Sequence, residues 1–211
     1  DYRFTGDVEK NNPTISFAPN RESLNLYSTF LQDEIAIVKD RLGLTIGSKF
    51  EHNDYTGWEI QPSARLLWTP LKHQTFWASV SRAVRTPSRA EESVTLMQSQ
   101  QVAPGIFVPI TISGTNGFQS EKMTAYEIGY RTDPLEQLSL DFAAFYNNYE
   151  DLRSQQQNPS NPTQFYVGND LSGHTYGLEA TATWRVQDWW RLQPAYTWLQ
   201  MDLHSHPDGS S

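Results

Sequence analysis

The sequence predicts an all-β protein: an antiparallel sheet of about eight strands that forms a segment of a transmembrane β-barrel. Three observations lead to this prediction. Apolar and polar residues alternate in eight segments, which is the period of a strand. The connections between these segments are alternately short and long, as they are in barrels that span a membrane. The polar faces carry charged residues in mid-strand, as expected of a wet or plugged lumen.

The first half of the chain contains four of the predicted strands. Leu24–Val38 alternates weakly, whereas Leu42–Phe50 places apolar residues on one face and Gly, Thr and Lys on the other. Trp58–Trp68 begins and ends in tryptophan, and ten steps of about 3.3 Å at a tilt of about 40° give about 25 Å, the height of a barrel's apolar band. Pro62 lies inside this strand, so we expect a bulge or register shift there. Thr75–Val84 alternates weakly.

The second half supplies the other four. Lys122–Arg131 alternates weakly, and Leu138–Asn147 and Thr175–Trp184 alternate clearly. Arg191–Met201 is weaker, and Pro194 within it predicts another local irregularity. We expect all eight strands to be antiparallel.

The connections are alternately short and long, which predicts a sheet with short turns at one end. The long, irregular connections then lie together at the other end, which is the elaborated end. Of the elaborated connections, Thr86–Gln119 is the longest, and we expect its apolar run Ile106–Ile112 to fold back as a short hairpin. The short connections are Lys39–Arg41, Thr69–His73, Thr132–Gln137 and Arg185–Trp189; the longer ones are Glu51–Gly57, Thr86–Gln119, Asp151–Thr163 and Asp202–Ser211.

Composition excludes several classes of protein. No apolar stretch approaches the eighteen residues of a membrane helix. The net charge of -8, with dispersed Lys and Arg, argues against nucleic acid as a partner. The chain has no cysteine, which rules out disulfides, thiolate metal sites and a cysteine nucleophile. No low-complexity linker divides the sequence, so we interpret it as one architectural unit.

Periodicity alone leaves open which way the apolar face points. We expect Leu44, Ile46, Leu66, Phe142 and Leu178 on the convex, lipid-facing surface. The charged residues of the opposite, concave face are then Lys49, Arg65, Asp141 and Glu179.

Several segments together resemble the TonB-dependent outer-membrane receptor family, from about Leu24 to Asp202. They are "QDEIAIVKDRLGLTIGSKFEHNDYTG", "QPSARLLWTP", "TFWASVSRAVRTPSRAEE", "SEKMTAYEIGYR", "FAAFYNNYEDLR" and "HTYGLEATATW", in this order. The resemblance implies a plugged barrel of about 22 strands in the bacterial outer membrane. Such a receptor imports a scarce nutrient with energy passed through TonB. Residues 1–211 would be the middle of that barrel, without the plug domain and C-terminal strands.

This resemblance also implies partners and cargo. The partners are outer-membrane lipid, an extracellular ligand, and the plug domain and TonB, both through other parts of the protein. An iron–siderophore complex is our first choice of cargo, with vitamin B12, other metals and carbohydrates left open. We expect no enzymatic activity and no cofactor.

The candidate ligand-binding residues are Arg85, Arg89, Phe107, Tyr149 and Arg153, near the elaborated end. Guanidinium groups bind carboxylates and similar anions in a bidentate manner, which suits an anionic ferric siderophore. The structural alternative is that the arginines pair with loop acids such as Glu91 and Glu92. His204 and His206 could share a metal, but two ligands are too few, and we expect no metal site.

Two other hypotheses remain open at this point. A complete eight-stranded outer-membrane barrel with a structural or adhesive role would require Leu24–Val38 to pair with Arg191–Met201. A soluble β domain that binds carbohydrate through tryptophans would pack its apolar faces inside.

Overall fold

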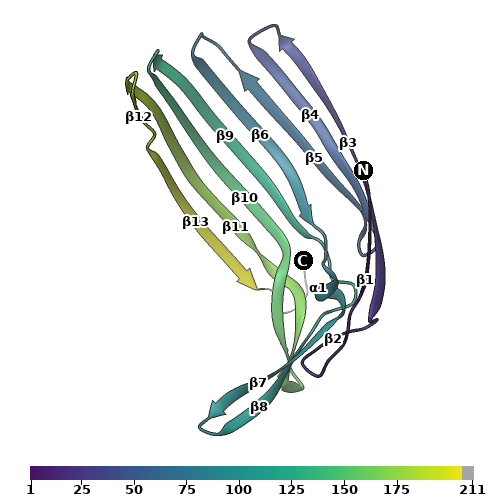
Figure 1. The fold of residues 1–211 in the computed structure, drawn as a ribbon. Helices are drawn as coiled ribbons and strands as arrows, with labels where there is room; N and C mark the ends of the chain where they lie inside the picture. Colours follow the sequence, from purple (N-terminus) through teal and green to yellow (C-terminus); the bar gives the residue numbers. More distant parts are fainter. Residues whose placement is uncertain (206–211) are drawn as a thin grey trace.

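A computed structural model describes residues 1–205 as one open, curved sheet with a single short helix (Figure 1). The strand order is β1-β3-β4-β5-β6-β9-β10-β11-β8-β7-β2, and β12 and β13 also pair with β11. Among these residues no helix is long and apolar enough to cross a bilayer. The elements are β1 (Tyr2–Val8), β2 (Ile15–Phe17), β3 (Arg21–Val38), β4 (Leu42–Asn53), β5 (Gly57–Trp68), β6 (Gln74–Arg85), α1 (Arg89–Ser93), β7 (Val94–Ala103), β8 (Ile106–Ser113), β9 (Glu121–Leu135), β10 (Leu138–Asn158), β11 (Asn161–Gln187), β12 (Trp190–Leu192) and β13 (Ala195–Ser205).

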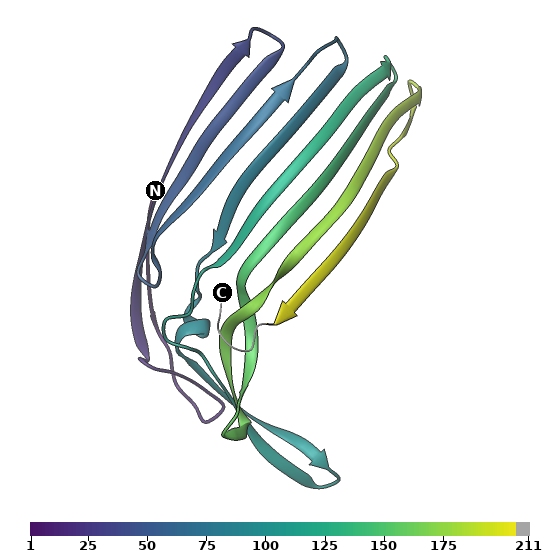
Figure 2. The same cartoon turned by 180° about the vertical axis from the view of Figure 1, so that it is seen from behind.

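All eight predicted strands are present as β3, β4, β5, β6, β9, β10, β11 and β13, and neighbours among them are antiparallel. Figures 1 and 2 show the short turns at one end of the sheet, with α1, β2, β7 and β8 gathered at the other. We call this second end the elaborated end. The predicted asymmetry is therefore confirmed for the longest connection, whereas Glu51–Gly57, expected to be one of the longer connections, is only a three-residue turn at residues 54–56. Of the predicted connection Asp202–Ser211, the first four residues belong to β13 and the rest lie outside the described residues.

Several local predictions need correction. The strands β1 and β2 were not expected: β2 has only three residues, and the alternation of Tyr2, Phe4 and Val8 with polar residues in β1 was overlooked. The short β12 is the beginning of the predicted strand Arg191–Met201. Asp151–Thr163, expected as a loop, continues β10 and β11 to a turn at residues 159–160, because its Gln, Asn and Ser residues extend the antiparallel ladder. The predicted hairpin exists as β7–β8 and is longer than its apolar run.

The two prolines interrupt the sheet differently. At Pro62 the β4–β5 register runs on without a shift, contrary to expectation, but the β5–β6 ladder begins only at Ser63. The absent proline N–H accounts for this, since the missing donor ends the ladder on one side. Pro194 separates β12 from β13, as predicted.

The apolar residues form one continuous face. In the register Leu44 lies opposite Leu66, and Ala144 links Ile128 to Leu178 across β9, β10 and β11. Leu178 is 54% exposed and Ile128 is 61% exposed. A sheet with so many exposed apolar side chains on one face needs a nonpolar environment in contact with that face.

Aromatic side chains line up across this face. Phe76 on β6 stacks on Tyr130 of β9 with ring centroids 4.5 Å apart, and Trp68 of β5 lies tilted against Phe76 at 5.4 Å. Tyr176 meets Trp198 edge-on at 5.8 Å. Such cross-strand pairs stabilise a sheet by about 0.5–1.5 kcal/mol each beyond their buried area.

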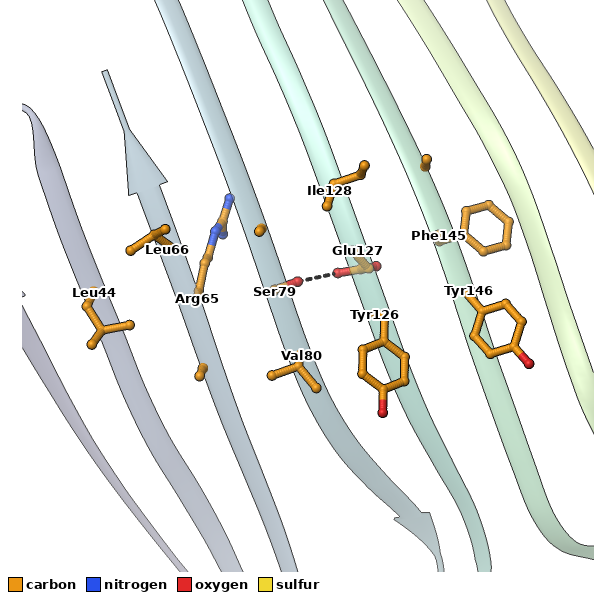
Figure 3. Close-up of a pocket in the computed structure, with 13 residues that line it drawn as sticks. Leu44, Arg65, Leu66, Ser79, Val80, Tyr126, Glu127, Ile128, Phe145 and Tyr146 are labelled. Atoms are coloured by element: carbon orange, nitrogen blue, oxygen red, sulfur yellow. Dashed lines mark hydrogen bonds between the residues drawn. The ribbon is translucent and has the colours of Figure 1, made fainter. Parts of the chain in front are cut away.

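A shallow hollow lies in the middle of the apolar face (Figure 3). It forms because Ala64, Ala78 and Ala144 are shorter than their neighbours Leu66 and Ile128, and its volume is about 590 Å³. Most of its lining is apolar, as on the rest of that face. Arg65, Ser79 and Glu127 also border it, and the Ser79 hydroxyl donates to the Glu127 carboxylate at 2.9 Å.

Both rival architectures are contradicted by the pairing. Within residues 1–205, β3 pairs with β1 and β4, and β13 pairs with β11, so the closure expected of an eight-stranded barrel does not occur. The carbohydrate-binding domain required a buried apolar face, but the described strands form one sheet with that face exposed.

The most buried side chains gather at the elaborated end. Phe118 and Ser120 are each 2% exposed, and Val94 and Val167 are also buried. The Thr115 hydroxyl donates to the Val167 carbonyl at 2.5 Å, which fastens the segment after β8 to β11. A small core therefore holds the long connection against the strand ends.

Candidate functional site

The helix α1 is a single turn defined by a capping box. Glu91 stands three residues after Ser88, and its carboxylate accepts hydrogen bonds from the Ser88 backbone N–H and hydroxyl, both at 2.9 Å. This Ser-x-x-Glu pattern satisfies N–H groups that have no partner within the helix. It fixes the Glu91 side chain next to the end of β6.

Glu91 connects two arginines from different strands. Arg85, the last residue of β6, donates to both Glu91 oxygens at 3.0 and 2.7 Å, and to Glu121 at 2.7 Å. Arg85 and Glu121 are direct cross-strand partners. The Nε atom of Arg153 on β10 lies 4.0 Å from Glu91. We call these four residues the α1 cluster.

The charge state of Glu91 follows from these partners. Burial acts to raise its pKa, but hydrogen bonds from Arg85 and Ser88 outweigh burial and lower the pKa to about 2. The carboxylate therefore stays ionised at neutral pH. Its side chain is 4% exposed, against 47% for Arg85 and 60% for Arg153, so the acid lies beneath two partly open guanidinium groups.

Arg89 has a different environment. Its guanidinium forms ion pairs with Asp7 at 2.6 Å and Glu22 at 3.1 Å, donates to the Pro19 carbonyl at 2.6 Å, and lies 4.9 Å above the Phe17 ring. The side chain is only 10% exposed. Arg89 therefore ties α1 to β1, β2 and β3, and its contacts are internal.

Tyr149 lies on β10, where the regular β10–β11 register ends. Its hydroxyl is 3.4 Å from that of Thr175. It lines two cavities: one of about 700 Å³ at the elaborated end, and one of about 610 Å³ on the polar face of the sheet. In the first, Lys122 and Asp151 form an ion pair at 2.5 Å. Tyr149 is thus placed where a ligand could reach it.

Phe107 is apart from the other candidates. It lies near the tip of the β7–β8 hairpin, opposite Gln101, and is 62% exposed. Figure 2 shows this hairpin projecting past the sheet beside the β10–β11 turn. Three residues of β8 pair in parallel with β11, which holds the base of the hairpin.

The structure brings Arg85 and Arg153 together in one cluster, with Arg89 on the adjoining helix. The pairing alternative is confirmed for Arg85 and Glu91; Arg89 pairs instead with Asp7 and Glu22. Sequence reasoning missed these two acids, which come from distant segments. It also missed Glu121, which strand pairing opposite Arg85 could have revealed.

No resident metal site emerges from the described part of the chain. Residues 1–205 contain no group of three or more His, Cys, Asp or Glu that could hold a metal ion. His204 lies on β13, 3.3 Å from Ser172, while His206 is outside the described residues.

Comparison with protein families gives one match across nearly the entire chain. The family model is described as "TonB dependent receptor-like, beta-barrel", and it matches residues 1–210. Among curated proteins, none matches this chain in sequence.

Solved structures show the same fold. A ferric enterobactin receptor, PfeA, of Pseudomonas aeruginosa matches with a TM-score of 0.71 and 20% identity, over 85% of this chain and 27% of that one. The siderophore receptor PirA of Acinetobacter baumannii matches with a TM-score of 0.70 and 14% identity, over 86% of this chain and 28% of that one. The FrpB iron transporter of Neisseria meningitidis matches with a TM-score of 0.64 and 16% identity, over 88% of this chain and 27% of that one. This chain thus spans little more than a quarter of these relatives.

Proposed function

Since this chain belongs to the TonB-dependent receptor β-barrel family, we propose that it is part of an outer-membrane receptor that imports a ferric siderophore. Proteins of this family are transporters rather than enzymes, and they reside in the outer membrane. The observation that carries the proposal is the family match over residues 1–210, which coincides with an open antiparallel sheet elaborated at one end.

In this proposal the two faces and two ends have distinct roles. The apolar face contacts lipid, and the face bearing Arg65, Asp141 and Glu179 lines the lumen beside a plug domain contributed by another part of the protein. The elaborated end is extracellular and the short turns are periplasmic. Energy reaches the receptor through TonB, which contacts parts outside this chain.

The cargo contacts that we propose within this chain come from Tyr149, Arg153 and Phe107. Tyr149 lines two cavities, and the other two side chains are more than half exposed. Arg85 is half exposed, so it can contribute donors that Glu91 and Glu121 do not use. The internal contacts of Arg89 support a role in ordering the loop instead.

Uptake of iron by cells tests this function. The full-length receptor containing this chain, as the sole siderophore receptor of an iron-limited strain, should import radiolabelled ferric siderophore only when TonB is present. Replacing Tyr149 and Arg153 together with Ala should weaken binding by about tenfold, since each lost polar contact is worth about 0.5–1.5 kcal/mol.

The matched control is Tyr196→Ala with Arg185→Ala. Tyr196 lies on the apolar face and Arg185 near the short turns, so this pair should leave affinity unchanged. Uptake that continues without TonB would contradict the transport proposal. Equal affinity in both double variants would remove Tyr149 and Arg153 from the cargo site.

A further inference from the structure

Four basic side chains in and near the α1 cluster lie next to acids. Arg85 and Arg89 form two ion pairs apiece, and Lys122 pairs with Asp151. Arg153, the most exposed of these cations, still lies 4.0 Å from Glu91, and its backbone N–H donates to Glu121 at 2.8 Å. An anion that bound here would have to compete with carboxylates already in place.

The elaborated end as a whole carries excess negative charge. Its segments 1–25, 49–59, 82–122, 148–175 and 202–205 contain nine Lys and Arg against fourteen Asp and Glu, a net charge of −5. A surface of this sign repels anions at long range and slows their association. The part of the mouth that this chain builds is therefore unsuited to attracting an anionic cargo.

The charged residues of the longest connection, Thr86–Gln119, all lie among its first seven residues. From Ser93 to Ser120 the sequence has no Asp, Glu, Lys, Arg or His. Its hairpin presents exposed apolar side chains at Met97, Val102 and Phe107, interspersed with Gln98 and Gln100. Apolar and amide groups of this kind contact uncharged ligands through dispersion and neutral hydrogen bonds.

From these three features we infer that the cargo is an electroneutral ferric complex of the trihydroxamate class. This inference rests on the proposed siderophore uptake and specifies its substrate. Three hydroxamate groups carry one negative charge each and balance Fe³⁺, which leaves a neutral complex with amide and apolar surface. Three catecholates leave a strongly anionic complex, which the charge distribution described above disfavours.

Binding measurements on the purified full-length receptor test the inference. The probes are ferrichrome, a neutral ferric trihydroxamate, and ferric enterobactin, an anionic triscatecholate. Ferrichrome should bind at least tenfold more tightly. Its affinity should change by less than about twofold between low and high salt, because screening acts on charged partners. A preference below tenfold, or one for ferric enterobactin, overturns the inference and leaves siderophore uptake standing. Failure of both probes to bind also overturns the inference, and TonB-dependent uptake of ferric siderophore then decides the proposed function separately.

A charge variant separates electrostatics from shape. Glu121→Gln removes one acid beside Arg85, so the affinity for ferric enterobactin should rise severalfold while that for ferrichrome stays within twofold. Glu136→Gln, the same change in the turn between β9 and β10 at the opposite end, is the control and should alter neither. Equal responses of the two probes to Glu121→Gln would show that charge does not select the cargo.

Discussion

Replacing Gly177 with alanine is expected to disrupt assembly of the sheet at β11. A Cβ at this position would lie 2.3 Å from the Trp198 carbonyl oxygen on β13 and 2.6 Å from the Phe145 ring on β10. The carbonyl belongs to the paired backbone and cannot turn away as a side chain could. Overpacking of this kind costs about 1–3 kcal/mol or more, so the fraction of folded, heat-modifiable receptor should fall by at least half.

Gly43→Ala is the matched control, because its nearest contact would be the Ile35 carbonyl at 4.0 Å, an ordinary van der Waals distance. It should assemble as the parent protein does. Adding Phe145→Ala to Gly177→Ala should give only partial rescue, since the Trp198 carbonyl remains. Normal assembly of Gly177→Ala alone would show that β11 and β13 are not paired as described.

Replacing Glu91 with alanine should loosen the entire long connection between β6 and β9. The change removes the acceptor of Arg85, the neighbour of Arg153 and the side-chain half of the capping box at Ser88. Amides in residues 86–120 should exchange with solvent about 10- to 100-fold faster, since local opening becomes easier when a buried charge network is broken. Hydrogen exchange followed by mass spectrometry measures this directly.

Acid should reproduce the effect in the unaltered protein. The folded-state pKa of Glu91 is lowered from 4.5 to about 2, so its stabilising contribution is complete above about pH 4.5 and is lost as the pH falls toward 2. Glu136→Ala at the opposite end serves as the control. Exchange in residues 86–120 that is unaffected by Glu91→Ala would mean that the cluster does not order the connection.

The membrane-spanning part of this fold could be predicted from sequence because its rules are local. Alternation over ten or so residues fixes both the strand and the face of each side chain, as Leu138–Asn147 and Thr175–Trp184 illustrate. The turns between long strands are equally local. Every predicted strand was found for this reason, and the errors there concern the strand ends and the two prolines inside strands.

The candidate site was less predictable because its contacts span the chain. Arg89 reaches Asp7 and Glu22, which precede it by more than sixty residues, and only the folded sheet brings them together. A capping box at Ser88 and Glu91 is visible in the sequence, yet a one-turn helix gives no periodic signal. The effect of Pro62 was predicted only in part. Its missing N–H limits the pairing of β5 with β6, but the pairing with β4 on the other side continues without a shift.

The central claim is that the apolar face of this sheet meets lipid and the polar face meets a water-filled or plugged lumen. This chain has no cysteine, so single cysteines can be introduced at each position from Asp141 to Asn148 on β10, in an otherwise cysteine-free full-length receptor, and spin-labelled. In lipid bilayers, labels at even positions such as Phe142 and Ala144 should be accessible to oxygen dissolved in lipid. Labels at odd positions such as Asp141 and Ala143 should be shielded from oxygen. A period of two with this phase supports the account; the opposite phase, or no periodicity, would contradict it.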